Sequence, residues 1–290
     1  MRVLVVGASG HLGSAVAAHM SALADVTATT RQSLDVRDHG AVEALVARLR
    51  PEAIINCSAY TDVDGAEDQP VEALNVNAFA VRVLAAAGAR VGAAFVHYST
   101  DFVFDGTATR PYTEDDQPNP RSTYACSKLL GEWFARGAPR HYVLRVESIF
   151  GALPAGPGAR RTSVDRIVDS IVAGVEVPVF VDRTVSPSYH RDVAAATAAL
   201  LDRGAPAGLY HCVNGGSCTW EGLALEAARQ LGVNARLKPV RMADAGLRAQ
   251  RPQYCALSNA KLTAAGATMP DWRDALGRYL AARRPGAARS

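Results

Sequence analysis

A glycine-rich turn close to the N-terminus constrains the fold of this chain more than any other feature. The apolar run 3–6 ends directly at Gly7, glycines follow at positions 10 and 13, and the alanine-rich segment 11–23 then has the pattern of a helix. Strand, glycine turn and helix in this order are typical of the first unit of a dinucleotide-binding fold. A turn that only joins a strand to a helix is the alternative.

Each glycine of this G-x-x-G-x-x-G loop has its own role in such a fold. Gly7 allows the tight turn, Gly10 lets the backbone approach a pyrophosphate, and Gly13 lets the helix pack closely on the strand. The helix N-terminus then faces the phosphates. For His11, contact with phosphate and a solvent-facing position are both open. No Gly-Lys-Ser/Thr follows Gly13, which argues against a P-loop.

Further apolar runs alternate with helical patterns along the chain. Strand-like runs occupy 26–28, 54–57, 94–97, 142–146 and 177–181, and most are separated by helical patterns such as 42–49 and 78–87. This alternation predicts an α/β fold with a doubly wound parallel sheet. The Gly/Pro-rich passage 151–158 indicates a boundary. We predict a Rossmann-like dinucleotide-binding domain of residues 1–150 plus 189–213, and a smaller substrate-binding lobe of residues 151–188 plus 214–290.

Composition excludes several classes of protein. The net charge is only +3 and the basic residues are scattered, so nucleic acid is not an expected partner. The five cysteines form no C-x-x-C pair, which argues against a disulfide framework or a zinc site and predicts reduced, buried thiols. We find no signal peptide and no apolar run of membrane-spanning length, so we expect a soluble cytoplasmic protein without a membrane partner.

A tyrosine and a lysine four residues apart carry the expected chemistry. On a helix, Tyr124 and Lys128 lie on one face, one turn apart, and the ammonium is expected to lower the pKa of the phenol. Such a tyrosine could exchange protons near neutral pH. Alone, the spacing is weak evidence, because a surface pair has the same pattern.

Hydroxyl groups at the end of a strand strengthen the case. Ser99 and Thr100 end the strand-like run 95–98, where the strands of an open sheet meet the ligand crevice. The Thr100 hydroxyl can hydrogen-bond a carbonyl oxygen while Tyr124 supplies the proton, and this stabilises the charge that builds up during hydride transfer. The alternative is that Thr100 has only a structural role, as a turn residue at the end of a strand.

The end of the second strand bears on the choice of cofactor. NAD-binding proteins usually carry an acid there, whereas this chain has Arg31, which favours the additional phosphate of NADP. A solvated surface arginine is an equally open interpretation of Arg31. The acidic cluster 62–68 has its glycine too early for an EF-hand, so we interpret it as a helix cap.

Taken together, these segments resemble an extended short-chain dehydrogenase/reductase, and specifically the dTDP-4-dehydrorhamnose reductase family. The likeness covers nearly the whole chain. The resemblance rests on the following segments: the loop 7–13, Asn-Cys-Ser-Ala-Tyr-Thr-Asp-Val-Asp-Gly-Ala-Glu at 56–67, Val-Asn-Ala at 76–78, His-Tyr-Ser-Thr-Asp-Phe-Val-Phe-Asp-Gly at 97–106, Tyr-Ala-Cys-Ser-Lys at 124–128 with Gly-Glu at 131–132, and Arg-Pro at 251–252.

The resemblance implies NADPH, with NADH as the alternative, and a sugar-nucleotide substrate whose C4 ketone is reduced. The implied catalytic residues are Thr100, Tyr124 and Lys128. The implied cofactor contacts are Gly7, Ser9, Gly10, His11, Leu12, Gly13, Arg31, Asp35, Val36, Cys57, Ser58, Ala59, Tyr60 and Asn77, together with Tyr124 and Lys128. The implied substrate contacts are Ser99, Asp101, Phe102, Val103, Glu147, Ser148, Arg183 and Arg251, with Arg251 expected at the diphosphate.

Three departures from the family pattern concern the substrate and a metal. Ser148 stands where the family usually has a tryptophan beside the sugar, and Arg183 stands in a segment that usually carries glutamine. Some relatives bind a metal at a dimer contact through a glutamate on the first helix, but Ala15 occupies that position, so we predict no metal. Assembly as a homodimer is left open.

Alternative functions also remain at this stage. They are a sugar-nucleotide epimerase or 4,6-dehydratase, a reductase of a nonsugar carbonyl, and a dinucleotide-binding regulatory subunit. A dehydratase is expected to have Asp-Glu after the hydroxyl residue, whereas Phe102 follows Asp101 here. The intact Thr100, Tyr124 and Lys128 set argues against a regulatory subunit without excluding it.

Overall fold

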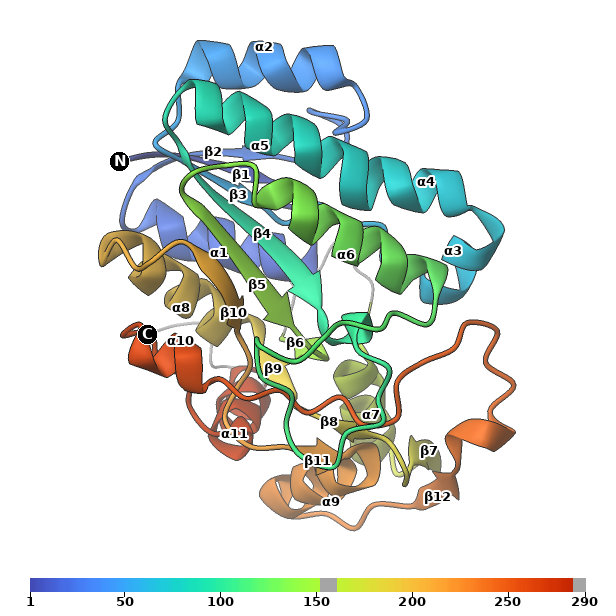
Figure 1. The fold of residues 1–290 in the computed structure, drawn as a ribbon. Helices are drawn as coiled ribbons and strands as arrows, with labels where there is room; N and C mark the ends of the chain where they lie inside the picture. Colours follow the sequence, from blue (N-terminus) through green and yellow to red (C-terminus); the bar gives the residue numbers. More distant parts are fainter. Residues whose placement is uncertain (152–160, 284–290) are drawn as a thin grey trace.

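The computed structural model describes residues 1–151 and 161–283. A six-stranded, entirely parallel sheet forms its centre, in the order β10-β5-β4-β3-β1-β2 (Figure 1). The strands are β1 (Arg2–Val6), β2 (Asp25–Thr29), β3 (Ala53–Asn56), β4 (Ala94–Thr100), β5 (His141–Val146) and β10 (Gly208–His211). The chain reverses direction across the sheet between β1 and β3, which creates a crevice at the carboxyl ends of these strands.

Helices cover both faces of this sheet. The helices α1 (His11–Ser21) and α8 (His190–Asp202) pack on one face, and α2 (His39–Leu49), α5 (Ala80–Arg90) and α6 (Thr123–Ala135) pack on the other (Figure 1). The strands β3 and β4 are buried along their whole length, because they are covered on both sides. The predicted α/β fold with a doubly wound parallel sheet is therefore confirmed.

Shorter elements complete the first part of the chain. They are α3 (Val63–Asp68), α4 (Pro70–Leu74), the π-helical turn η1 (Asn75–Phe79), the 3₁₀ turn η2 (Asp101–Val103) and α10 (Ala260–Ala264). Asp62 caps α3 by accepting a hydrogen bond from the backbone of Gly65, as predicted for the acidic cluster. Leu262 of α10 is buried in the same core as α1 and α8.

A smaller lobe with its own core lies beside the carboxyl ends of the strands (Figure 1). Phe150, Trp220, Trp272 and Tyr279 are buried in that core. Its elements are β6 (Ile149–Phe150), α7 (Ser163–Val172), β7 (Val177–Phe180), β8 (Thr184–Val185), β9 (Ser188–Tyr189), β11 (Cys218–Thr219), α9 (Trp220–Leu231), β12 (Leu237–Val240), η3 (Met242–Asp244) and α11 (Trp272–Ala282).

The run 177–181 does not extend the main sheet, because β7 pairs with β12 inside this lobe. The Gly/Pro-rich passage on which we placed the boundary falls largely on 152–160, outside the described residues. The division into domains stays a prediction.

Two expectations from composition need correction. The continuous helical run Pro70–Arg90 has 21 residues and a mean hydropathy of 1.3, so by length and composition it could cross a membrane. Because 56% of its apolar window is buried, it is a core helix of the α/β part. The cysteines are free among the described residues, but only Cys212 and Cys255 are buried and Cys126 is exposed.

Candidate active site

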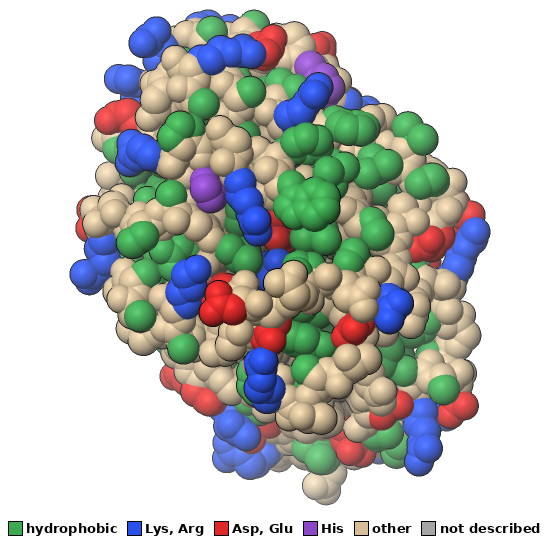
Figure 2. Space-filling model, viewed as in Figure 1, with side chains coloured by type: hydrophobic (Ala, Val, Ile, Leu, Met, Phe, Trp, Pro, Cys, Tyr) green, Lys and Arg blue, Asp and Glu red, His purple; other side chains and the backbone are tan. Residues whose placement is uncertain are grey.

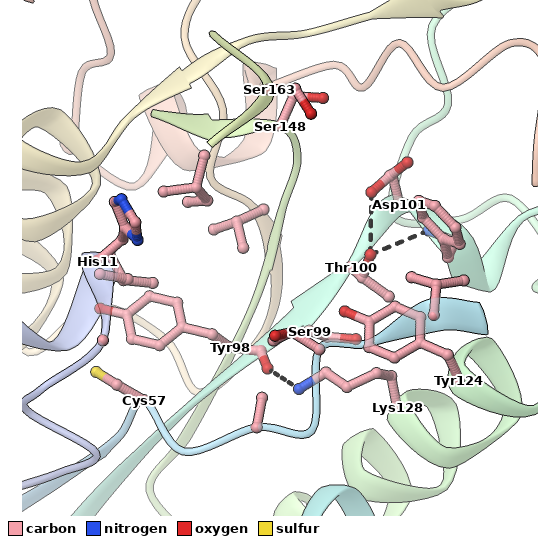
Figure 3. A pocket seen from close by; sticks show the side chains of 18 of the residues that line it. His11, Cys57, Tyr98, Ser99, Thr100, Asp101, Tyr124, Lys128, Ser148 and Ser163 are labelled. Atoms are coloured by element: carbon pink, nitrogen blue, oxygen red, sulfur yellow. Dashed lines mark hydrogen bonds between the residues drawn. The ribbon is translucent and has the colours of Figure 1, made fainter. Parts of the chain in front are cut away.

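A cleft of about 650 Å³ lies between the carboxyl ends of the central strands and the smaller lobe (Figure 3). Residues from both parts of the chain line it, and they include almost every side chain expected near the reacting atoms. The lining residues are Ser9, Gly10, His11, Leu12, Gly13, Cys57, Ala59, Thr61, Val63, Tyr98, Ser99, Thr100, Asp101, Phe102, Tyr124, Lys128, Val146, Ser148, Ile149, Ser163, Val164, Arg183 and Trp220.

A second cavity of about 220 Å³ continues from this cleft past the end of β2. The two share Ser9, Gly10, Cys57 and Ala59. The second cavity is also lined by the predicted residues Gly7, Arg31, Asp35, Val36, Ser58 and Tyr60. An extended ligand can therefore run from Arg31 over the glycine loop to Tyr124, which is the path that a dinucleotide requires.

The glycine loop is shaped by two close backbone contacts and one open position. Gly7 has a φ of +80°, and a Cβ there would lie 2.7 Å from the Ser58 nitrogen. A Cβ on Gly13 would lie 2.1 Å from the Gly7 oxygen. At Gly10 the nearest protein atom would be 3.6 Å away. Protein packing therefore explains Gly7 and Gly13 but not Gly10, where the open space fits a pyrophosphate above the N-terminus of α1.

The helix α6 brings Tyr124 and Lys128 to the cleft together, as their spacing predicts (Figure 3). Ser122 caps this helix, and Glu67 of α3 accepts hydrogen bonds from the backbone and the side chain of Thr123. The start of α6 is thus fixed on both sides. The Tyr124 hydroxyl lies next to Thr100, and Phe102 packs edge-on to the Tyr124 ring at 5.6 Å.

The electrostatics of the pair differ from the sequence-based expectation. Lys128 is 3% exposed, and its Nζ donates a hydrogen bond to the Tyr98 carbonyl oxygen at 2.5 Å. Burial lowers the pKa of Lys128 to about 8. Burial raises the pKa of Tyr124, opposed by a hydrogen bond with Thr100 and reinforced by the Asp101 carboxylate. The expectation that Lys128 makes this phenol acidic is therefore wrong, because the effect of burial dominates the pKa of Tyr124.

Thr100 ends β4 at the floor of the cleft. Its Oγ1 donates a hydrogen bond to Asp101 Oδ1 at 3.0 Å and accepts one from the Phe102 backbone at 3.3 Å. Ser99 also lines the cleft, but its hydroxyl donates to Glu132 Oε1 at 2.6 Å. Thr100 is therefore the hydroxyl residue of this strand end that faces the Tyr124 hydroxyl.

A buried ion pair between β5 and α6 stabilises the carboxyl end of β4. Arg145 on β5 donates from Nε and Nη2 to the two carboxylate oxygens of Glu132 on α6, at 2.8 and 2.9 Å. The two residues are 1% and 0% exposed. Together with the Ser99 hydroxyl, the pair links β4, β5 and α6, the three elements that carry Ser99, Thr100, Tyr124 and Lys128. A paired and fully hydrogen-bonded charge is tolerated at such depth, whereas a single one is not.

Four predicted site residues do not line either cavity. Val103 is fully buried and packs against Phe104 and Leu129. Glu147 is 2% exposed and accepts a hydrogen bond from the Ser186 backbone at 2.5 Å.

Arg251, the expected diphosphate contact, instead forms a bidentate pair with Asp64 at 2.9 and 2.8 Å. Asn77 is fully buried and bonds the Tyr60 backbone at 2.8 and 3.0 Å. Asn77 therefore positions the loop 58–60 and does not itself line the cavities.

The structure also adds residues that the sequence did not single out. Ser163, Val164 and Trp220 of the lobe close the larger cleft, and only the fold brings them there. Arg37 lines the smaller cavity beside Arg31 and donates to Asp35 and Glu72. The bond to Arg37 lowers the pKa of Asp35 to about 2. The spacing of Asp35 and Arg37 is a signal that could have identified this second arginine.

One group of buried side chains offers metal-ligand atoms. Single ligand atoms of Asp101, Glu147 and Cys255 lie within 4.8 Å of one another. The guanidinium of Arg183 lies at the same place, with Nη2 3.7 Å from the Cys255 sulfur and 4.0 Å from Asp101 Oδ2. Because Arg183 already supplies positive charge to this cluster, we infer that it takes the role of a cation there. The absence of a metal stays a prediction.

This placement of a tyrosine and lysine on α6, with a threonine at the end of β4 and a glycine loop before α1, is that of the extended short-chain dehydrogenases/reductases. The chain is an oxidoreductase of this class. It matches the RmlD substrate binding domain model over residues 1–284 and belongs to that family.

Curated relatives and solved structures agree with this assignment. The chain is 38% identical over 286 residues to the dTDP-4-dehydrorhamnose reductase of Streptomyces griseus, covering 95% of this chain and 91% of that protein. It is 36% identical to a probable dTDP-4,6-dihydroxy-2-methyloxan-3-one 4-ketoreductase of Streptomyces antibioticus, covering 95% and 93%. The crystal structure of a Bacillus anthracis dTDP-4-dehydrorhamnose reductase in complex with NADP has a TM-score of 0.90 at 30% identity and covers 96% of this chain and 98% of that one.

Proposed function

We propose that this protein is an NADPH-dependent reductase of the C4 ketone of a nucleoside-diphosphate 4-keto-6-deoxyhexose. The observation that carries this proposal is the meeting of Tyr124, Lys128 and Thr100 in one cleft that continues to the glycine loop. The relatives that bear on the substrate are named as reductases of dTDP-linked keto sugars. The cleft volume of about 650 Å³ is within the usual range of small-molecule sites.

The cofactor would lie with its pyrophosphate at Gly10 and its adenosine in the smaller cavity. Arg31 is 76% exposed at the mouth of that cavity, where it can move to meet a phosphate on the ribose. The relative bound to NADP supports the same choice. The nicotinamide, when bound, supplies the hydride. Lys128 would hold its ribose, because the ammonium faces the cleft floor beside Tyr124.

The residues of this chain supply the proton and bind the ketone oxygen. The raised pKa keeps Tyr124 protonated at neutral pH, so the phenol can donate to the alkoxide that forms as the ketone is reduced. Thr100 beside it donates a second hydrogen bond to the same oxygen and stabilises its developing charge. The phenol thus starts in the protonated form that a donor needs, and transfer is favourable because an alkoxide is a stronger base than a phenolate.

The alternatives make different demands on this cleft. A 4,6-dehydratase is expected to need an acid at position 102, and that position holds Phe102 against the Tyr124 ring. An epimerase would return its hydride to the same sugar, so it would show no net oxidation of NADPH. A regulatory subunit would bind NADPH and turn over no sugar, and a reductase of a nonsugar carbonyl would not require the diphosphate.

The test is a spectrophotometric assay of purified protein with NADPH and dTDP-4-keto-6-deoxyhexose. We expect stoichiometric loss of NADPH absorbance and a 4-hydroxy product identified by mass spectrometry. NADH in place of NADPH measures the cofactor preference. Tight binding of NADPH without oxidation by any keto-sugar nucleotide would contradict the proposal and favour the regulatory or nonsugar alternative.

We further propose that two copies of this chain associate through the outer face formed by α4, η1 and α6. Hydrophobic side chains gather on this face in Figure 2, and the exposed ones include Trp133 at 59%, Val71 at 68% and Phe79 at 36%. A cytoplasmic location remains our expectation. Light scattering coupled to size exclusion should give the mass of two chains, and Trp133→Glu should give one. A single-chain mass for the wild type at all concentrations would contradict the dimer.

A further inference from the structure

Four buried polar side chains meet beneath one wall of the cleft. Asp101, Glu147, Arg183 and Cys255 are 3%, 2%, 8% and 1% exposed. Asp101 follows β4 and Glu147 follows β5, whereas Arg183 lies between β7 and β8 of the smaller lobe and Cys255 lies between η3 and α10. The cluster therefore forms where the dinucleotide-binding part meets the lobe, one residue away from Thr100.

The hydrogen bonding of this cluster is incomplete. Asp101 Oδ2, Glu147 Oε1 and Arg183 Nε have no hydrogen-bond partner among the described residues. Arg183 Nη2 is 4.0 Å from Asp101 Oδ2, which is too long for a hydrogen bond. A buried polar group without a partner destabilises the folded protein. Asp101 and Arg183 both line the cleft, so the unpaired Asp101 Oδ2 and Arg183 Nε point to a ligand that supplies the missing hydrogen bonds.

The guanidinium is held in place although its hydrogen bonds are few. Arg183 lies over the Phe102 ring at 5.3 Å and lines the cleft. Two acids face it, and burial raises the pKa of Asp101 and that of Glu147. Asp101 and Glu147 oppose each other electrostatically, and Arg183 favours the charged form of both. Glu147 thus acts on a ligand through Arg183, since it does not line the cleft.

The reacting ketone fixes which part of a sugar reaches Arg183. If Thr100 and Tyr124 bind the ketone oxygen at C4, the neighbouring substituents are the C3 hydroxyl and the methyl group on C5. Thr100 donates to Asp101 at 3.0 Å, so the cluster is next to the ketone site. A hydroxyl can accept from Arg183 and donate to the Asp101 carboxylate, whereas a methyl group leaves both unpaired. The C3 side of the sugar therefore matches this wall.

Building on the proposed reductase, we propose that Arg183, positioned by Asp101 and Glu147, binds the C3 hydroxyl and makes the cleft selective for 3-hydroxy over 3-deoxy sugar nucleotides. Sites that hydrogen-bond a hydroxyl discriminate strongly against the analogue that lacks it, because the buried polar groups of the protein are then left without a hydrogen-bond partner. The position of Ser148 supports this, since a small side chain at the cleft leaves Arg183 accessible where the family usually places a tryptophan.

The test measures binding separately from turnover. Calorimetry with the NADP-bound protein compares dTDP-rhamnose with its 3-deoxy derivative, and we expect the wild type to bind the hydroxylated sugar about 10- to 100-fold more tightly. Arg183→Gln should bind the two sugars within about twofold of each other while keeping the wild-type affinity for NADPH. Arg236→Gln, an exposed arginine of the same lobe, is the matched control and should keep the preference.

Each result decides between the possibilities. Equal binding of the two sugars by the wild type would overturn the proposal, and so would an Arg183→Gln protein that keeps the preference. If Arg183→Gln does not fold, Glu147→Gln replaces it and should weaken the preference without changing NADPH affinity. A wild-type protein that shows the preference but never oxidises NADPH would support the role of Arg183 and refute the reductase.

Discussion

Two alanine substitutions in the glycine loop should separate stability from cofactor binding. Gly10 and Gly13 lie three residues apart at the start of α1, yet the protein surrounds them differently. A Cβ on Gly13 would lie 2.1 Å from the Gly7 oxygen and 2.9 Å from the Gly7 carbonyl carbon. A Cβ on Gly10 would have nothing closer than 3.6 Å. Only the Gly10 position is open toward the cleft.

The magnitudes follow from these contacts. Gly10 has φ −78° and ψ 167°, which alanine adopts freely, so the gain from a less flexible unfolded chain and the poorer N-cap should nearly cancel, within about 1 kcal/mol. Gly13→Ala forces backbone apart, and a cost of about 1–3 kcal/mol or more exceeds the helix-propensity gain of about 1 kcal/mol. A methyl group on Gly10 would overlap the pyrophosphate at a similar overpacking cost of about 1–3 kcal/mol, equivalent to about 5- to 150-fold weaker NADPH binding.

The assay uses urea unfolding of the cofactor-free proteins and fluorescence titration with NADPH. We expect Gly10→Ala to unfold like the wild type and bind NADPH weakly, and Gly13→Ala to unfold at lower urea concentration. Wild-type NADPH affinity in Gly10→Ala would refute the placement of the pyrophosphate. Wild-type stability in Gly13→Ala would refute the packing argument.

Three further predictions follow from the site. Lys128→Met should raise the free energy of unfolding of the cofactor-free protein by about 1–3 kcal/mol at pH 7. The reason is that burial lowers the pKa of Lys128 from 10.5 to about 8, so the charged amine destabilises the folded protein below pH 8. This destabilisation disappears by pH 10.5, where the amine is neutral in the folded protein. Urea unfolding at pH 7 and 10.5 checks this, and an equal gain at both would contradict it. Glu132→Gln leaves the buried charge of Arg145 without a partner and should lower the free energy of unfolding by about 3–5 kcal/mol in the same assay. The control Glu43→Gln, in the exposed pair with Arg90, should lower it by less than about 1 kcal/mol. Similar losses in the two variants would contradict the role of burial. Arg31→Ala should weaken NADPH binding about tenfold and leave NADH binding unchanged, and equal effects on the two cofactors would argue against a phosphate contact.

Local patterns in the sequence were sufficient for the fold and for the centre of the site. The β-branched runs and the glycine loop act over a few residues, so they predict β1, α1 and the parallel sheet directly. The spacing of Tyr124 and Lys128 likewise needs only a helix. The position of Thr100 at the ligand crevice is predictable because the strands of a parallel sheet end at a common edge.

Contacts between distant segments account for what the sequence missed. The pairing of Arg251 with Asp64 joins residues far apart in the chain, and no local pattern indicates it. Trp220 reaches the cleft only because α9 packs in the lobe beside it. The pKa of Tyr124 depends on burial, which the spacing of the pair does not reveal. Long-range packing thus decides both the charge state and the walls of the site.

The central claim is that Tyr124 donates the proton to the reduced carbonyl oxygen. Tyr124→Phe removes one oxygen from a partly buried ring and keeps its contact with Phe102. With NADPH and the keto-sugar nucleotide, we predict an unchanged NADPH dissociation constant and a kcat about 10²- to 10⁴-fold below the wild type, as expected for loss of a general acid. A Tyr124→Phe enzyme that turns over at the wild-type rate would contradict the account.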